Sequence, residues 1–240
     1  MTRIYGTLFG LGAGAGNPEW LTLQADRILK RSRVIALPRG IARAVGRAEE
    51  IVEAYLTPDK YLLRLAFPMT QDENVLARAW NDARDQVLSH LTQGLDVVFV
   101  TEGDPSLYST FSYLADAVLA KCPEIAVEIV PGISSVSAAA ARLGVSLARS
   151  GQSVAVIPAV NGLNQLSQAL DVCDTVVILK FSRVFDRVYE LLDSRGLLPD
   201  TVYLAGIGTT QEEIRGDLHE MKERVPPYMS LLVVRQRCPD

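Results

Sequence analysis

An apolar run that stops at a Gly-Asp-Pro turn constrains the fold of this chain more than any other feature. Residues 97–100 are β-branched or aromatic and uncharged, which is typical of a strand buried on both faces of a parallel sheet. Gly103 can adopt a positive φ or let the backbone approach a ligand, Asp104 offers a carboxylate and Pro105 fixes the chain direction. Apolar spacings of three and four then predict a helix at 111–119. The turn is expected at the carboxyl end of a strand, where open α/β sheets bind small molecules, and a merely turn-forming Asp stays open as the alternative.

Short apolar runs alternate with helical periodicity along the chain, which predicts an α/β fold. Strands are predicted at 4–11, 34–37, 61–67, 97–100, 125–130, 154–158, 176–181, 202–205 and 228–235. Helices are predicted at 23–29, 42–56, 75–91, 111–119, 136–143, 163–170 and 184–194. The 240 residues suit one large domain or two of about 110 to 130 residues, and we expect two α/β domains, residues 1–124 and 125–240. Two prolines precede the last strand, which is compatible with antiparallel pairing there.

Composition and charge argue against several classes of function. Hydrophobic residues make up 48% and charged residues 22%, which is typical of a folded globular protein. The net charge of −4 creates no global field that favours nucleic acid or an acidic membrane. The three cysteines lie far apart, and with only two histidines they form no metal-ligand spacing. Since neither a membrane-length apolar stretch nor a signal-like start is present, we expect a cytoplasmic protein without metal, membrane or nucleic-acid partners.

A glycine-rich loop follows the first predicted strand. Gly10, Gly12 and Ala15 satisfy the loose pattern of dinucleotide-binding loops. The second strand of such a fold ends in an acidic residue that binds ribose, whereas Pro38 and Arg39 stand here. A nicotinamide-dependent oxidoreductase therefore stays open as a distant alternative. The other interpretation is that the glycines of this loop only allow two layers of the fold to pack closely. Because hydrolase and phosphate-loop motifs are absent from the sequence, we favour chemistry in which a reactive cofactor supplies the electrophile and the protein supplies geometry.

Three motifs, taken in order, resemble the tetrapyrrole methylases. They are GLGAGAGNPEWLT at 10–22, TEGDP at 101–105 and PGISS at 131–135. Residues 103–114 and 135–144 resemble the branch of this family that methylates C20 of precorrin-2, or of its cobalt-bearing counterpart, in cobalamin synthesis. The resemblance covers nearly the whole chain. It implies two α/β domains with S-adenosylmethionine in the cleft between them, a tetrapyrrole substrate and a homodimer.

The same resemblance assigns residues to the two ligands. The expected cofactor contacts are Glu102, Gly103, Asp104, Leu107, Ser134, Ser135, Lys180, Gly208 and Ser230. Of these, Asp104 is expected to accept hydrogen bonds from ribose or amino groups, and the two serines are equally suited to cap the helix that follows them. A substrate with several carboxylates calls for arginines, which bind carboxylates in a bidentate manner. The expected substrate contacts are Arg39, Arg43, Tyr108, Arg142 and Arg183.

The sequence also departs from the family's pattern. Ala15 and Asn17 replace the Pro and Asp of the usual Gly-Pro-Gly-Asp loop, so we assign no cofactor contact to this loop. Pro38 stands near the place where uroporphyrinogen methylases have an acidic residue proposed for proton abstraction, so we name no general base. The remaining alternatives are methylation of another ring carbon, methylation of a protein side chain as in diphthine synthases, and a non-catalytic binding module.

Overall fold

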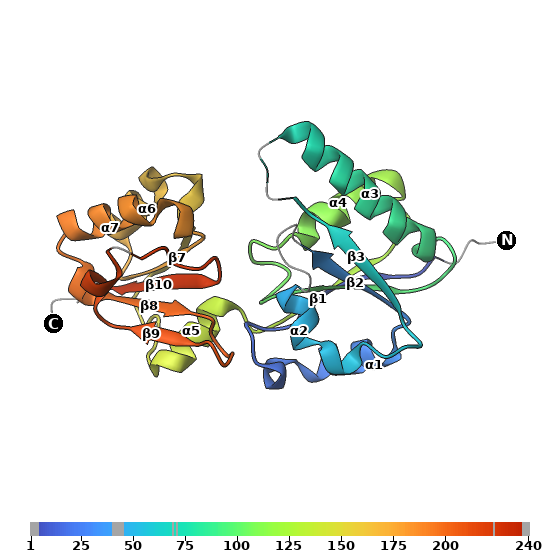
Figure 1. Ribbon diagram of the computed structural model, residues 1–240, viewed down its shortest axis with the longest axis horizontal. Helices are drawn as coiled ribbons and strands as arrows, with labels where there is room; N and C mark the ends of the chain where they lie inside the picture. Colours follow the sequence, from blue (N-terminus) through green and yellow to red (C-terminus); the bar gives the residue numbers. More distant parts are fainter. Residues whose placement is uncertain (1–4, 40–45, 69, 71, 223, 237–240) are drawn as a thin grey trace. The chain divides into compact units, whose positions relative to one another are not determined.

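The computed structural model describes residues 5–39, 46–68, 70, 72–222 and 224–236 of the chain. The chain forms two compact units, Met1–Ser134 and Ser135–Asp240. Each unit contains one five-stranded sheet with helices packed against it (Figure 1). The mixed α/β architecture that the sequence predicts is therefore confirmed.

All strands of the first sheet run parallel. They are β1 (Leu8–Gly12), β2 (Val34–Arg39), β3 (Tyr61–Ala66), β4 (Val97–Thr101) and β5 (Val127–Val130), in the spatial order β3-β2-β4-β1-β5. Every residue of the central strand β4 is buried, as its uncharged sequence predicts. The carboxyl ends of these parallel strands therefore share one edge of the sheet.

Helices cover both faces of this first sheet (Figure 1). They are α1 (Leu23–Arg31), α2 (Arg47–Ile51), α3 (Glu73–Leu91) and α4 (Phe111–Lys121), with 3₁₀ turns at Pro18–Trp20 and Glu53–Tyr55. One core lies under α3 and α4 and contains Phe99 and Phe111, and the other lies under α1 and α2 and contains Phe9 and Val98. Of the helix expected at 42–56, the structure forms only α2 and the second 3₁₀ turn, and residues 40–45 lie outside the described residues.

The second unit has a mixed sheet. Its elements are α5 (Ser135–Leu143), β6 (Val154–Pro158), α6 (Leu163–Val172), β7 (Thr175–Leu179), α7 (Phe185–Ser194), β8 (Thr201–Ala205), β9 (Glu213–Arg215) and β10 (Ser230–Arg235), with 3₁₀ turns at Ala159–Asn161, Ser182–Val184, Leu198–Asp200 and Leu218–Met221. The spatial order is β6-β7-β10-β8-β9. Strand β10 pairs antiparallel with both β7 and β8, which confirms the suggestion drawn from the prolines before it.

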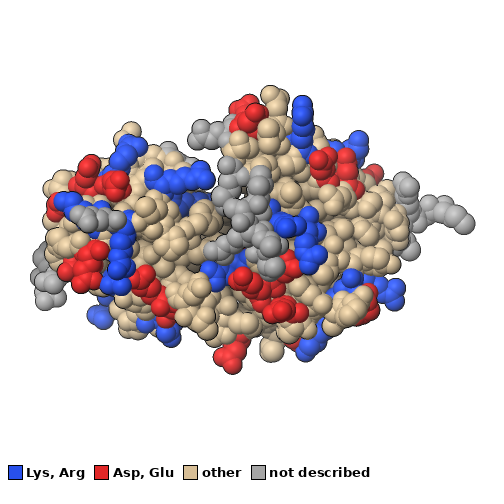
Figure 2. All heavy atoms as spheres, in the orientation of Figure 1, with Lys and Arg blue, Asp and Glu red and all other residues tan. Residues whose placement is uncertain are grey.

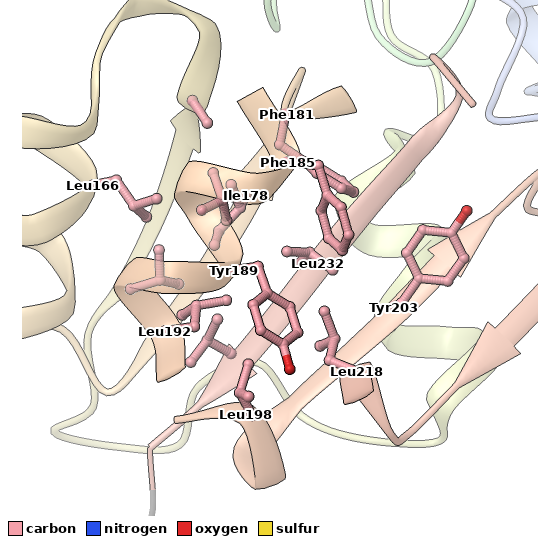
Figure 3. Packing of buried hydrophobic residues seen from close by; sticks show 14 of the residues in the cluster. Leu166, Ile178, Phe181, Phe185, Tyr189, Leu192, Leu198, Tyr203, Leu218 and Leu232 are labelled. Atoms are coloured by element: carbon pink, nitrogen blue, oxygen red, sulfur yellow. The ribbon is translucent and has the colours of Figure 1, made fainter. Parts of the chain in front are cut away.

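The core of the second unit lies between α6, α7 and the sheet. Phe181, Phe185 and Tyr189 form a row of rings whose centroids are 5.7 and 6.1 Å apart. Figure 3 shows this row beside Leu192 of α7 and Leu232 of β10. Because β10 lies in the middle of the sheet, its residues 231–234 are buried and form part of the core of this unit.

The boundary between the two units lies after Ser134, later in the sequence than expected. We expected the division after residue 124, but β5 pairs in parallel with β1, with Leu8 opposite Val127. The first unit therefore extends to Ser134. Within the described ranges, none of the helices combines the length and apolar character that crossing a bilayer requires.

Candidate functional site

The loops after β1 and β4 are joined by their backbones at the carboxyl edge of the first sheet. The N–H of Gly103 donates to the carbonyl of Gly14 at 2.8 Å, and the N–H of Gly14 donates back at 3.3 Å. Both residues have positive φ, +64° at Gly103 and +83° at Gly14, a conformation that glycine adopts without strain. The Gly-Asp-Pro turn is therefore anchored on the glycine-rich loop.

The loop after β5 packs against these two loops with no side chain between them. A Cβ atom at Gly132 would lie 2.2 Å from the carbonyl oxygen of Gly103 and 2.7 Å from the Cα of Gly12. A Cβ atom at Gly12 would lie 2.6 Å from the same oxygen. Only glycine allows this approach, so Gly12, Gly103 and Gly132, the glycine cradle, form a close backbone contact between three loops.

Asp104 connects two of the three loops. Its Oδ2 accepts a hydrogen bond from the N–H of Gly132 at 2.9 Å. Its Oδ1 accepts from the N–H of Ser106 at 2.8 Å and also from the Ser106 hydroxyl. Burial acts to raise the pKa of the Asp104 carboxyl, but the hydrogen bonds from Ser106 and Gly132 outweigh burial and hold this pKa below its ordinary value. The carboxylate therefore fixes the geometry of the glycine cradle.

The segment after Asp104 carries two further predicted site residues. Leu107 and Tyr108 are exposed, and Tyr108 has φ of +51°, which is unusual for a residue with a side chain. Ser109 holds the end of this segment, because its hydroxyl donates to Oγ1 of Thr101 at 3.1 Å and accepts from the N–H of Phe111 at 3.1 Å. The loop thus presents Tyr108 to solvent in a conformation that its neighbours maintain.

Of the other predicted residues, Glu102 and the two serines are adjacent in sequence to the loops after β4 and β5, whereas Arg39 lies on another strand. Glu102 is half-buried and directly precedes Gly103, and Arg39 is exposed at the carboxyl end of β2. Ser134 is half-buried at the end of the first unit, and Ser135 is the first residue of α5 in the second unit. Arg43 lies outside the described residues.

In the second unit, the structure brings three predicted cofactor residues to one edge of the sheet. Lys180 follows β7, Gly208 lies in the turn after β8 and Ser230 begins β10. Because β10 is antiparallel to both neighbours, its first residues lie beside the last residues of β7 and β8, with Ser230 opposite Ala205. The exposed Arg183 lies in the 3₁₀ turn that follows β7.

Lys180 has two unusual properties for a lysine. Its φ is +52°, in the left-handed region that favours glycine. Its side chain is half-buried, and this burial lowers the pKa of the ammonium group. Such a strained, desolvated residue at the end of a strand is typical of a ligand-binding edge.

Glu212 binds both Gly208 and Arg142. Its Oε2 accepts from the N–H of Gly208 at 2.8 Å, and its Oε1 accepts from Nε and Nη2 of Arg142 at 2.8 and 2.6 Å. Burial acts to raise the pKa of Glu212, but the bonds from Arg142 and Gly208 outweigh it and the pKa is lowered. No sequence motif indicates a role for Glu212, because an acidic residue in a polar loop matches no motif and its arginine partner lies far away in the chain.

Charged side chains of both signs lie on the face of the molecule shown in Figure 2. On the face shown in Figure 2, basic and acidic side chains are interspersed on both units, without a continuous basic stripe across the described residues there. A nucleic-acid footprint consists of clustered Lys and Arg, which this face does not present.

The topology removes the support for a nicotinamide-dependent oxidoreductase. In the dinucleotide-binding fold β1 lies next to β2, whose end supplies the ribose ligand. Here β4 lies between β1 and β2. Gly10 has a packing role, because a Cβ atom there would lie 2.3 Å from the ring of Phe111 on α4. The glycine pattern is thus explained by close packing of layers.

Comparison with curated proteins identifies relatives of similar length. The cobalt-precorrin-2 C(20)-methyltransferase of Salmonella typhimurium is 33% identical over 233 residues, which cover 97% of this chain and 97% of that protein. The precorrin-2 C(20)-methyltransferase of a Sinorhizobium species is 29% identical over 95% of both chains. The cobalamin biosynthesis protein CobIJ of Mycobacterium tuberculosis is 31% identical over 240 residues, and the chain spans about half of it, 46%.

Solved structures share the fold, and a family model covers most of the chain. Cobalt precorrin-4 methyltransferase has a TM-score of 0.73 at 22% identity, covering 95% of this chain and 94% of that one. Uroporphyrin-III C-methyl transferase from Thermus thermophilus, complexed with S-adenyl homocysteine, has a TM-score of 0.70 at 23% identity, covering 96% and 97%. The model of the tetrapyrrole (corrin/porphyrin) methylases matches residues 7–222. This match and the full-length relatives confirm the resemblance seen in the three motifs, and the chain belongs to the tetrapyrrole methylases.

Proposed function

We propose that this protein transfers the methyl group of S-adenosylmethionine to C20 of precorrin-2, or of its cobalt-bearing counterpart, in cobalamin synthesis. The observation that carries the proposal is the 33% identity to the Salmonella enzyme of that name over 97% of both chains. Methylation of another ring carbon, or of a protein side chain, is less favoured, because full-length relatives with this identity act at C20 by name.

The residues present suit a nucleoside cofactor with a charged sulfur. In the glycine cradle a Cβ atom at Gly12 or Gly132 would collide with the carbonyl oxygen of Gly103, so these glycines hold in place the loop that carries the proposed contacts Gly103 and Asp104. We propose cofactor contacts at Glu102, Gly103, Asp104, Leu107, Ser134, Ser135, Lys180, Gly208 and Ser230. When bound, S-adenosylmethionine supplies an already activated methyl group. The protein's own task is to orient the two reactants and exclude water.

The substrate contacts in this proposal are basic or aromatic side chains. Arg39, Arg183 and Arg43 would bind carboxylates of the tetrapyrrole, and Tyr108 would pack against its ring. Arg142 already donates to Glu212 from Nε and Nη2, so its Nη1 group would make the substrate contact. In this assignment the arginines select a polycarboxylate and take no part in proton transfer.

We also propose that the protein works as a homodimer in the cytoplasm, as the family resemblance implies. Analytical ultracentrifugation of the purified chain tests the first point. A sedimenting species of twice the chain mass at micromolar concentration supports the dimer, and a monomer at all concentrations contradicts it.

A substrate panel tests the proposed reaction. Purified protein is incubated with isotopically labelled S-adenosylmethionine and, in separate reactions, precorrin-2, cobalt-precorrin-2 and uroporphyrinogen III. We expect label in a trimethylated product from precorrin-2 or its cobalt form and none from uroporphyrinogen III. Transfer to uroporphyrinogen III alone would assign the chain to another branch, and cofactor binding without any transfer would support a binding module.

A further inference from the structure

We infer that Glu212 is a positioning residue that holds the turn of residues 206–212 in its ligand-binding conformation. The inference rests on the proposed function, because Gly208 of this turn is one of the proposed cofactor contacts. Glu212 itself lies outside all the residues assigned to cofactor or substrate. It would act through the backbone of Gly208.

The turn depends on local backbone geometry that glycine alone adopts easily. Gly206 and Gly208 have φ of +56° and +75°. The N–H of Gly206 donates to the carbonyl of Met229 at 2.9 Å, and the Thr209 hydroxyl donates to the carbonyl of Gly206 at 2.7 Å. These bonds fix the first part of the turn. Glu212 fixes the second part, because its carboxylate accepts from Gly208 N–H.

Glu212 suits this role through burial and charge. Its side chain is only 15% exposed, so its charge needs protein partners. Arg142 of α5, 70 residues earlier in the chain, donates to Oε1 from Nε and Nη2. Its Nε also reaches Oε2 at 3.1 Å, and Oε2 accepts the shorter hydrogen bond, 2.8 Å, from the N–H of Gly208. Charge-assisted hydrogen bonds of this kind are stronger than neutral ones and define orientation. The Arg142–Glu212 pair therefore links a helix of the second unit to the conformation of the turn.

A more exposed ion pair elsewhere in the second unit provides a control for losing an Arg–carboxylate pair away from the turn. Asp171, at the end of α6, accepts from Nη1 of Arg195 at 2.5 Å, and it does not lie in the turn. Loss of the carboxylate at Asp171 removes an Arg-carboxylate pair from the same unit. Its effect on stability serves as the comparison for Glu212.

The test combines ligand affinity with stability and turnover in Glu212→Ala, Glu212→Gln and Asp171→Asn. Calorimetry measures the Kd of S-adenosylhomocysteine, and steady-state assays with precorrin-2 give kcat and the KM of the cofactor. We expect Glu212→Ala to raise Kd and KM about tenfold, the effect of losing a charge-assisted hydrogen bond, with kcat within about twofold at saturating cofactor. Glu212→Gln keeps an acceptor for Gly208, and we expect a rise of about threefold. Asp171→Asn should change the melting temperature alone.

The outcomes separate the inference from the proposed function. A wild-type protein that does not bind S-adenosylhomocysteine contradicts the proposed function, and the inference falls with it. A wild-type protein that binds, with Glu212 variants that keep its Kd and KM but melt earlier, overturns the inference alone and makes the pair purely structural. If Glu212→Ala does not fold, the same measurements on Glu212→Gln test the inference. An unchanged Kd and KM in Glu212→Gln equally overturns it.

Discussion

The side chain of Asp104 stabilises the contact between two loops by accepting hydrogen bonds from their backbone N–H groups. Its two carboxylate oxygens accept hydrogen bonds from Gly132 and Ser106 and hold the loops after β4 and β5 together. The sequence predicts a carboxylate at the end of a strand, and this position is confirmed. The sequence does not predict its partners, because Gly132 lies 28 residues further along the chain and the contact depends on the tertiary fold.

Removing the Asp104 carboxylate should weaken both the fold and the cofactor site. In Asp104→Ala the N–H groups of Gly132 and Ser106 lose their acceptor, so we expect the free energy of unfolding and the binding of S-adenosylhomocysteine each to fall by about 1 to 3 kcal/mol. Ser106→Ala removes one donor only and should cost less than about 1 kcal/mol in either quantity. Urea titration and calorimetry give the two quantities. If both the free energy of unfolding and the affinity for S-adenosylhomocysteine are unchanged in Asp104→Ala, the carboxylate does not stabilise the cofactor site and Asp104 only forms the turn.

The lowered pKa of Asp104 leads us to expect that the stability of the fold depends on pH. The folded-state pKa of Asp104 lies below its ordinary value of 3.8, so its ionised form stabilises the fold above that value. This stabilisation is lost as the pH falls through the lower, folded-state pKa. Below that pKa the side chain of Asp104 is protonated and uncharged, like the Asn side chain of Asp104→Asn. We expect the stability gap between the two proteins, measured by urea unfolding, to be full at about pH 7 and to shrink below about pH 4. A gap that is constant across this range would contradict the account.

At the scale of elements, hydrophobic periodicity predicts most strands and helices but not how they pair. The continuous apolar runs become β4 and β7, and the stripe of apolar residues at 75–91 becomes α3. Strand β9 was missed because Glu213–Arg215 is short and carries charge at both ends, and its place depends only on pairing with β8. The boundary after residue 124 differs from the structure for the same reason, since pairing of β5 with β1 is a long-range contact.

Close packing of the loops that follow the strands explains why Gly12 and Gly132 are glycines, and no dinucleotide-binding role is needed. In Gly132→Ala the new methyl group would collide with backbone atoms of Gly103 and Gly12, which have no flexible side chain to move. We expect a loss of about 1 to 3 kcal/mol in stability together with loss of cofactor binding. Gly216→Ala is the matched control, because nothing lies within 4 Å of a Cβ atom there, and its stability should stay within about 0.5 kcal/mol of wild type. Equal stability in the two variants would contradict the close packing of the three loops.

At the scale of the whole molecule, each unit has its own sheet, its own core and one edge that carries predicted ligand contacts. In the first unit these lie at the carboxyl end of β2, in the loop after β4 and at the end of the loop after β5. In the second unit they lie in the segments after β7 and β8 and at the start of β10. The sequence motifs predicted the strand-end loops after β4 and β5, whereas the contacts at Lys180, Gly208 and Ser230 were expected only by position within the family resemblance. The sequence could not predict Glu212, whose role depends on an arginine of α5.

Methyl transfer to C20 of the macrocycle is tested by the position of the new methyl group in the product. Purified protein is incubated with precorrin-2 or cobalt-precorrin-2 and S-adenosylmethionine carrying ¹³C in its methyl group, and the product is examined by NMR. We expect a single enriched methyl carbon, bonded to C20 of the macrocycle. Enrichment at any other ring carbon, or a cofactor-binding protein that leaves both substrates unlabelled, would contradict it.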